Sequence, residues 1–389
     1  MPAPACRHAS VATDTSSIGT NATITGNAQV LADAKATSVD GASVATAGGT
    51  PGSNNLDVVG IQMSANDTLT VGTNATINAT AADTLTANAT STASTAAATT
   101  QTLNAAGLES NVVTVGDTAT VTATSTLSGT ANATTVGDAA GDNATATAKV
   151  TTNSGADTAG ATSFGNDGTL TATATSTQAA TALSVSGNAT ADGKVITSNI
   201  GLDAASTTTI GDQGAITGRA TSTNTSTATT TEGDAASTSS TALNTGVESN
   251  GALSIGSSGT VLGAAVGTDT ARATSTDGDA TATADATTNL GVDSNAALTI
   301  GSTGSLTGTA SLGLNATAVT VGEQRHSAHR RRQRRHGRGE HRLGPGCRRH
   351  HDRHRGHRGG QRQPHHRGIR HGHHGRRRGR RHDHQQHRY

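Results

Sequence analysis

The sequence predicts an all-β protein, a parallel β-solenoid of about 45-residue repeats followed by a disordered C-terminal tail. Three observations support this class. Large side chains are scarce, a motif recurs at a constant interval, and short segments alternate apolar with polar residues. The alternative is a largely disordered chain, since low hydrophobicity also typifies disorder.

The composition excludes a conventional core. Hydrophobic residues make up 32% of the 389 residues, and alanine supplies most of them. There is no Trp, and Phe164 and Tyr389 are the only aromatic residues. Each fully buried Val, Leu, Ile or Phe contributes about 1.5–3 kcal/mol to folding, so this chain is too poor in them for an ordinary two-layer core. A fold must therefore be one that small residues suit.

The repeat is clearest in the second half of the sequence. Gly201, Gly246 and Gly291 open the phrases Gly-Leu-Asp, Gly-Val-Glu and Gly-Val-Asp, 45 residues apart. Nine residues after each glycine comes an isoleucine followed by Gly-x-x-Gly, beginning at Ile210, Ile255 and Ile300. A Gly-Asp landmark near mid-repeat, at Gly233-Asp234 and Gly278-Asp279, divides the unit into halves of about 22 residues. We expect each half to form one coil, hence two coils per repeat.

The local patterns favour strands over helices. Thr, Ser, Asn, Asp and Gly disfavour helix interiors. Segments 169–175, 253–255 and 298–300 alternate apolar with polar residues, which places one kind on each face of a strand. The Gly-x-x-Gly phrase suits a corner, where we expect glycine to supply positive φ. A narrow solenoid stacks like residues, so Ala, Val, Ile, Leu and Thr can fill its interior.

Composition divides the chain into three segments. Residues 1–54 form an irregular N-terminal segment, which could be a degenerate repeat; residues 55–322 form the repeat domain, and residues 323–389 the Arg/His-rich tail. Six of the 28 Lys and Arg and 23 of the 27 Asp and Glu precede residue 323, so the charge is −17 before it and +18 after it. Such asymmetry is typical of a basic arm for polyanions.

The abrupt change after Gly322 has a second explanation. In GC-rich codons, Glu323-Gln324-Arg325-His326 becomes Asp-Asn-Ala-Thr when one base is deleted, and Asp-Asn-Ala-Thr already occurs at residues 142–145. Our hypothesis is that residues 323–389 are the repeat translated out of frame. The start of the chain resembles the tail in its Cys-Arg-His composition, so the true start is also open.

Two features of the repeat domain could carry a binding function. Asp203, Glu248 and Asp293 would form an acidic column, and with Asn250, Asn295 and corner carbonyls they could bind calcium, which prefers several oxygen ligands. The alternative is a solvated row of carboxylates two coils, or about 10 Å, apart, whose repulsion water reduces to roughly 0.4 kcal/mol. Thr-Ala alternations would place Thr ladders on one face, as ice-binding solenoids do, but the Thr rows shift between copies of the repeat, which argues against ice binding.

The tail offers different chemistry. His365, His366, His371, His373 and His374 could chelate a transition metal, and the clustered arginines could bind nucleic acid without sequence specificity. The Arg run has no aromatic residue within it for base stacking.

Several functional classes are disfavoured. Cys6 and Cys347 are the only cysteines, so no disulfide framework or zinc spacing follows. No apolar run is long enough to span a bilayer, and no secretory signal opens the chain. His8 is the only histidine before residue 323, so the repeat holds no nucleophile–base arrangement and we expect no enzyme and no cofactor beyond calcium.

The phrases at residues 297–301 and 318–322, Ala-Leu-Thr-Ile-Gly and Ala-Val-Thr-Val-Gly, look like the short strands of bacterial surface repeats. The chain is similar in style, over roughly residues 55–322, to autotransporter adhesin heads and Ala/Thr-rich cell-surface repeat proteins. That resemblance implies an extracellular or cell-surface structural role, with an extracellular surface or glycan as partner. The alternatives are a polyanion- or metal-binding protein acting through its tail, and a frameshifted fragment with no function of its own.

Overall fold

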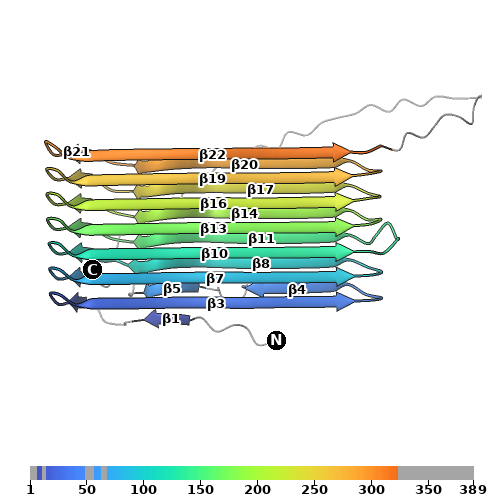
Figure 1. Cartoon of the computed structure of the whole chain (residues 1–389), viewed down its shortest axis with the longest axis horizontal. Coiled ribbons are helices and arrows are strands. Elements are labelled where there is room, and N and C mark those ends of the chain that lie inside the picture. The colour runs from blue at the N-terminus through green and yellow to red at the C-terminus, as the bar shows by residue number, and fades with distance from the viewer. Residues whose placement is uncertain (1–6, 11–14, 49–56, 63–67, 323–389) are drawn as a thin grey trace, which may run out of the picture. The chain divides into compact units, whose positions relative to one another are not determined.

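A computed structural model describes residues 7–10, 15–48, 57–62 and 68–322. In these residues the regular structure is entirely β, and the strands form three parallel sheets (Figure 1). The expected all-β parallel solenoid is thus confirmed, and the disordered alternative does not describe this part of the chain. Residues 15–48, within the expected N-terminal segment, form strands of the same sheets.

Each sheet is a ladder in which every strand pairs with its equivalent in the next repeat. Sheet 1 contains β3 (Thr23–Ser38), β7 (Thr76–Ser91), β10 (Thr120–Thr135), β13 (Thr169–Ser184), β16 (Ala215–Thr230), β19 (Thr260–Ser275) and β22 (Ser305–Thr320). Sheet 2 contains β1 (Arg7–Ser10), β4 (Ser43–Gly48), β5 (Asp57–Gln62), β8 (Ala96–Ser110), β11 (Ala144–Thr158), β14 (Ala189–Ala204), β17 (Ala235–Ser249) and β20 (Ala280–Ser294). Sheet 3 is short and contains β2 (Thr15–Ile18), β6 (Thr68–Val71), β9 (Val112–Val115), β12 (Thr162–Phe164), β15 (Thr208–Ile210), β18 (Leu253–Ile255) and β21 (Leu298–Ile300).

One 45-residue repeat makes one coil, so the expectation of two coils per repeat is wrong. Val261 of β19 pairs with Ile216 on one side and with Leu306 on the other, each 45 residues away. The two halves of a repeat do not stack. They form one strand of sheet 1 and one of sheet 2, which face each other across the core and contribute inward side chains from opposite sides.

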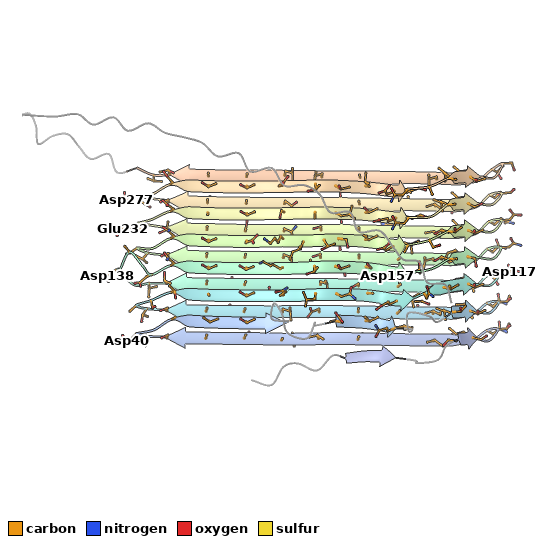
Figure 2. The ribbon with its side chains drawn as sticks, turned by 180° about the vertical axis from the view of Figure 1, so that it is seen from behind. Asp40, Asp117, Asp138, Asp157, Glu232 and Asp277 are labelled. Carbon is orange, nitrogen blue, oxygen red and sulfur yellow. The ribbon has the colours of Figure 1, made fainter. Side chains whose placement is uncertain are left out.

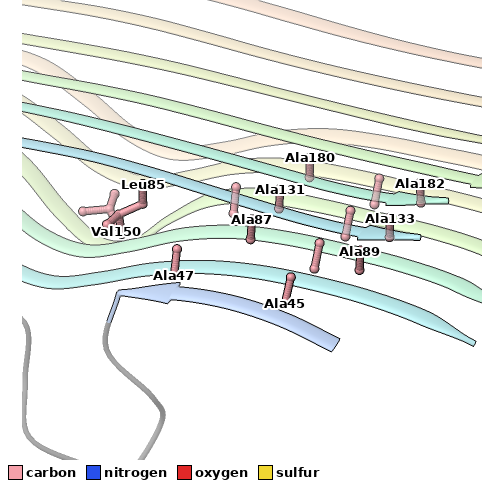
Figure 3. Packing of buried hydrophobic residues seen from close by; sticks show 14 of the residues in the cluster. Ala45, Ala47, Leu85, Ala87, Ala89, Ala131, Ala133, Val150, Ala180 and Ala182 are labelled. Carbon is pink, nitrogen blue, oxygen red and sulfur yellow. The ribbon is translucent and has the colours of Figure 1, made fainter. Parts of the chain in front are cut away.

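Two hydrophobic clusters fill the interior. One is lined largely by alanine between the two long sheets, with Leu85 and Val150 among its few large members (Figure 3). The other lies toward sheet 3 and is lined by larger aliphatic residues such as Leu202, Ile210 and Ile255. On sheet 1 inward positions alternate with outward ones, as in β10, whereas the long strands of sheet 2 bury four or five successive residues around the asparagine and glycine of each repeat. Alanine can therefore serve as core because two sheets carrying only methyl groups pack closely.

A column of glycines brings the two long sheets into contact at backbone level. A Cβ placed on Gly201 would lie 2.4 Å from the backbone nitrogen of Arg219, and one on Gly246 would lie 2.3 Å from that of Ala264. No side chain fits there, so the glycine that opens each Gly-Leu-Asp or Gly-Val-Glu phrase marks the closest approach of sheet 2 to sheet 1.

The corner after sheet 3 differs from the expectation. Positive φ lies on the residue before the second glycine or its equivalent, as at Gln213 (φ 60°) and Ser258 (φ 60°), not on the glycines. The first glycine is needed for a different reason. A Cβ on Gly256 would lie 2.8 Å from the carbonyl carbon of Gly211 in the preceding coil, so glycine allows the corners to stack closely.

Candidate functional site

The acidic column is real and longer than the sequence suggested. Asp203 pairs in register with Asp157 and Glu248, and Glu248 with Asp293. Glu109 extends the column by pairing with Asp157. The acids come from five successive strands of sheet 2, β8 to β20, and each follows the apolar residue next to the glycine column. The repeat period therefore places them on one line.

Neighbouring acids of the column lie closer together than the spacing expected from the sequence, because each repeat forms one coil and not two. In-register residues on neighbouring parallel strands are about 4.8 Å apart, not about 10 Å. At that distance two unit charges repel by about 0.9 kcal/mol in bulk water and about 3–4 kcal/mol at the effective dielectric near a protein surface. The column therefore opposes its own full ionisation.

Burial and mutual repulsion raise the pKa of the central acids. Burial, followed by the charges of Asp157 and Glu248, raises the pKa of Asp203 from 3.8 to about 7. Burial also raises the pKa of Asp157. The pKa of Glu248 is raised mainly by burial and further by Asp293, against the opposing effect of a hydrogen bond from Asn250. Asp203 is therefore partly protonated at neutral pH.

Polar neighbours flank the column without neutralising it. Gln62 donates from Nε2 to Oε2 of Glu109 at 3.1 Å, and Asn295 donates from Nδ2 to Oδ1 of Asn250 at 2.8 Å. The buried Oε2 of Glu248 has no hydrogen-bond partner. Within the described ranges, no three His, Cys, Asp or Glu side chains gather into a metal-binding group. Calcium binding by Asp203, Glu248 and Asp293 therefore stays a prediction.

Two further carboxylates lie inside the solenoid, where sequence reasoning did not place them. Asp83 is 1% exposed, and Asp269 is fully buried. Thr102 donates to Oδ2 of Asp83, whereas Asn224 Nδ2 donates to Oδ1 of Asp269 at 2.6 Å. Burial raises the pKa of both, that of Asp83 to about 6. The signal in the sequence is that both occupy inward-facing positions of the strand alternation. Asp83 pairs in register with Val30 and Leu127, and Asp269 pairs with Asn224 and Leu314.

An interior asparagine ladder holds successive coils together. Asn153 donates to Asn199 at 2.8 Å, Asn199 to Asn244 at 2.8 Å, and Asn244 to Asn289 at 2.7 Å. Each of these residues stands two positions before a glycine of the glycine column, so the phrase Asn-x-Gly was visible in the repeat. A buried amide requires partners for both its ends, and the stacked repeat supplies them for Asn199 and Asn244, whereas Oδ1 of Asn153 has no hydrogen-bond partner.

The corners carry two more ladders. At the corner after sheet 3, Asp117, Asn166 and Asp212 each accept a hydrogen bond from the backbone N–H of the equivalent residue in the next coil, at 2.7–3.0 Å. At the opposite corner, Asn143, Asn188 and Asp234 do the same, also at 2.7–3.0 Å. Figure 2 shows Asp117 at one end of the coils and Asp138, Glu232 and Asp277 at the other. Acidic and amide residues therefore recur at the corners partly because their oxygens link coils.

The transition-metal candidates His365, His366, His371, His373 and His374 lie outside the described residues, as does the whole Arg/His-rich tail. In the part that the structure covers, no helix is long and apolar enough to cross a membrane. No protein-family model matches the chain, and no curated protein or solved structure is significantly similar to it.

Proposed function

We propose that the chain is a non-enzymatic structural repeat protein of a bacterial cell surface, built to present broad strand faces for display or adhesion. The strongest support is the set of positions at which the same residue type recurs from coil to coil. The recurring residues include the glycine column, which joins the two long sheets. They also include the asparagine ladder, the corner acceptors and the aliphatic columns, which join one coil to the next. Such recurring contacts are expected of a scaffold whose constant task is stacking.

The test of surface location is immunolabelling of intact cells that produce the full chain. We expect labelling without permeabilisation, lost after brief protease treatment of whole cells. Labelling that appears only after permeabilisation would contradict the proposal. An adhesive role further predicts saturable binding of the purified chain to a glycan or host-cell surface, and no saturable binding to any such surface would leave only a structural role.

A specific observation favours the reading-frame alternative for the tail. In the described residues, the last coil, here called coil 7, comprises β21 of sheet 3 and β22 of sheet 1. In the two earlier coils formed by β9 to β11 and by β12 to β14, the next element is a sheet 2 strand, introduced by Asn143-Ala144-Thr145 and by Asn188-Ala189-Thr190. The one-base-shifted reading of residues 323–326, Asp-Asn-Ala-Thr, supplies this phrase. We therefore propose that the shifted frame encodes the sheet 2 strand of coil 7.

Resequencing of the gene across the codon of Gly322 decides between the two readings. A missing or extra base, with further Ala/Thr repeats in the corrected frame, supports the frameshift. A confirmed frame favours instead a genuine Arg/His-rich tail that binds polyanions or metals. Under that outcome, binding of the full chain to nucleic acid should weaken steeply with added salt.

A further inference from the structure

The outer face of sheet 1 is an ordered array of threonine side chains. Of the 24 outward positions on β10, β13 and β16, 18 are Thr. The sequence suggested that Thr rows shift between repeats, but on β10, β13 and β16 the rows keep their register, because the turns absorb the irregular spacing between strands. Other residues, such as Ala179 and Arg219, interrupt the rows at six positions. One column carries a hydroxyl in five successive coils. It consists of Thr84, Ser128, Thr177, Thr223 and Thr268.

The array is regular in two directions. Neighbouring strands place equivalent residues about 4.8 Å apart, and alternate residues along a strand lie about 6.7 Å apart. Both distances are close to the repeats of oxygen rows on the prism faces of hexagonal ice. The hydroxyls lie within one layer, and those of Thr120 and Thr169 on adjacent strands are 3.3 Å apart.

The face is also nearly free of charge. Along the outward positions of β7, β10, β13, β16 and β19, the charged residues are Arg219 and Arg272, and neither lies in the hydroxyl column. Sheet 2 differs, because its outer face carries the acidic column and the Lys194–Asp192 ion pair at 2.6 Å. A charged side chain holds a hydration shell unlike that of ice, whereas a Thr methyl beside a hydroxyl combines an apolar patch with a water anchor.

From this lattice of alternating methyl and hydroxyl groups on a backbone-fixed sheet that carries few charges, we propose that the outer face of sheet 1 binds ice. The ligand is the crystal surface of water itself. Each hydroxyl donates to and accepts from one water of the bound layer, and the methyl groups hold the intervening waters in cages. Since the parallel ladder already fixes the spacing, the face needs little ordering on contact. The inference is independent of where the protein resides and of the acidic column.

The test is thermal hysteresis of the full chain, together with its partition into a slowly growing ice shell. We expect a freezing point below the melting point, faceted ice crystals and incorporation of the protein into ice. Thr177→Tyr changes the centre of the hydroxyl column, and Thr84→Tyr is a second change in that column. Both sites are exposed, and Tyr is well accepted in strands.

The matched control is Thr190→Tyr, at an exposed strand position of β14 on the outer face of sheet 2. With circular dichroism and Tm unchanged, either sheet 1 variant should lose about half or more of the hysteresis, and Thr190→Tyr should retain it. Exclusion of the unmodified chain from growing ice would overturn the proposal. Equal loss in the sheet 1 and sheet 2 variants would overturn it as well, because the effect would then not belong to this face.

Discussion

Asn199 donates a hydrogen bond from its side-chain Nδ2 to Oδ1 of Asn244, one coil further along the stack, at 2.8 Å. Both residues are fully buried. Oδ1 of Asn199 accepts a hydrogen bond from Nδ2 of Asn153, so each member of the ladder provides the acceptor for the side-chain amide of the member before it. Loss of Asn199 therefore leaves the buried Oδ1 of Asn244 without its donor, whereas Nδ2 of Asn153 keeps its bond to the carbonyl oxygen of Thr175 at 3.1 Å.

Replacement of Asn199 by alanine should lower the free energy of unfolding by about 2–4 kcal/mol, since it removes two hydrogen bonds and leaves one buried acceptor without a donor. Chemical denaturation followed by circular dichroism measures this. The control is Asn295→Ala, which removes an equally short amide–amide bond at an exposed position and should cost less than about 0.5 kcal/mol. Equal costs at the two sites would show that burial is not what gives the interior ladder its importance.

The glycine column predicts a sharper loss. Gly246→Ala places a methyl group 2.3 Å from the backbone nitrogen of Ala264, so the two sheets must separate and the chain should fail to fold or lose more than about 3 kcal/mol. Gly141→Ala is the control, because a Cβ there meets nothing within 4 Å. We expect that control to be neutral or slightly stabilising. A well-folded Gly246→Ala protein with an unchanged Tm would be incompatible with the described contact between sheets.

The acidic column makes the stability of the fold depend on pH in the direction opposite to that produced by an acid in a salt bridge. The folded-state pKa of Asp203, about 7, lies above its ordinary value of 3.8, so the folded chain holds this proton more tightly. Its stabilising contribution is complete below about pH 4 and is lost as the pH rises through 7. We therefore expect Tm to be higher at pH 5 than at pH 8.

Asp203→Asn should raise the free energy of unfolding at pH 8 by about 1–2 kcal/mol and change it little at pH 4, because the amide cannot ionise and part of the side chain remains in water. Thermal scans across this range measure the difference. Asp33→Asn, at an exposed position on β3, is the control and should leave the profile unchanged. A Tm that rises from pH 5 to pH 8 in the unmodified chain would contradict the assignment.

The calcium interpretation predicts a separate result. A cation between Glu248 and Asp293 favours their ionised forms, so calcium should raise Tm at pH 8 and should do so less at pH 5. Magnesium should have a smaller effect, because it demands stricter geometry. Glu248→Gln should abolish the calcium-dependent rise. No change of Tm with calcium in the unmodified chain would leave the column as a proton-sharing row alone.

Much of the fold could be predicted from local patterns, but the number of coils that one repeat forms could not. The strand alternation at 169–175 and the constant interval between Gly201, Gly246 and Gly291 define parallel stacking. They do not say whether the halves of a repeat lie above one another or face each other, because both arrangements bury the same residues. The Gly-Asp landmark suggests the second corner of a smaller coil, whereas it lies at the far corner of one broad coil.

The earlier coils were harder to recognise for a related reason. In-register partners are 53 residues apart between Ile24 and Ile77, 44 between Ile77 and Val121, and 49 between Val121 and Leu170, before the interval approaches 45. The turns absorb these differences and leave the strands in register. Side chains such as Asp83 were missed because one sequence shows which residues are polar, and only the register shows that a polar one points inward.

The central claim is that residues 45 apart stack directly, as one coil per repeat. Spin labels at Leu31→Cys and Thr268→Cys, with Cys6 and Cys347 replaced by serine, test it by pulsed dipolar spectroscopy. These exposed positions share one register column, five strand spacings apart, through Thr84, Ser128, Thr177 and Thr223. The account predicts a narrow distance distribution centred near 24 Å, from about 4.8 Å per strand. A distribution near about 48 Å, as two coils per repeat would give, or a broad one typical of an unfolded chain, would contradict it.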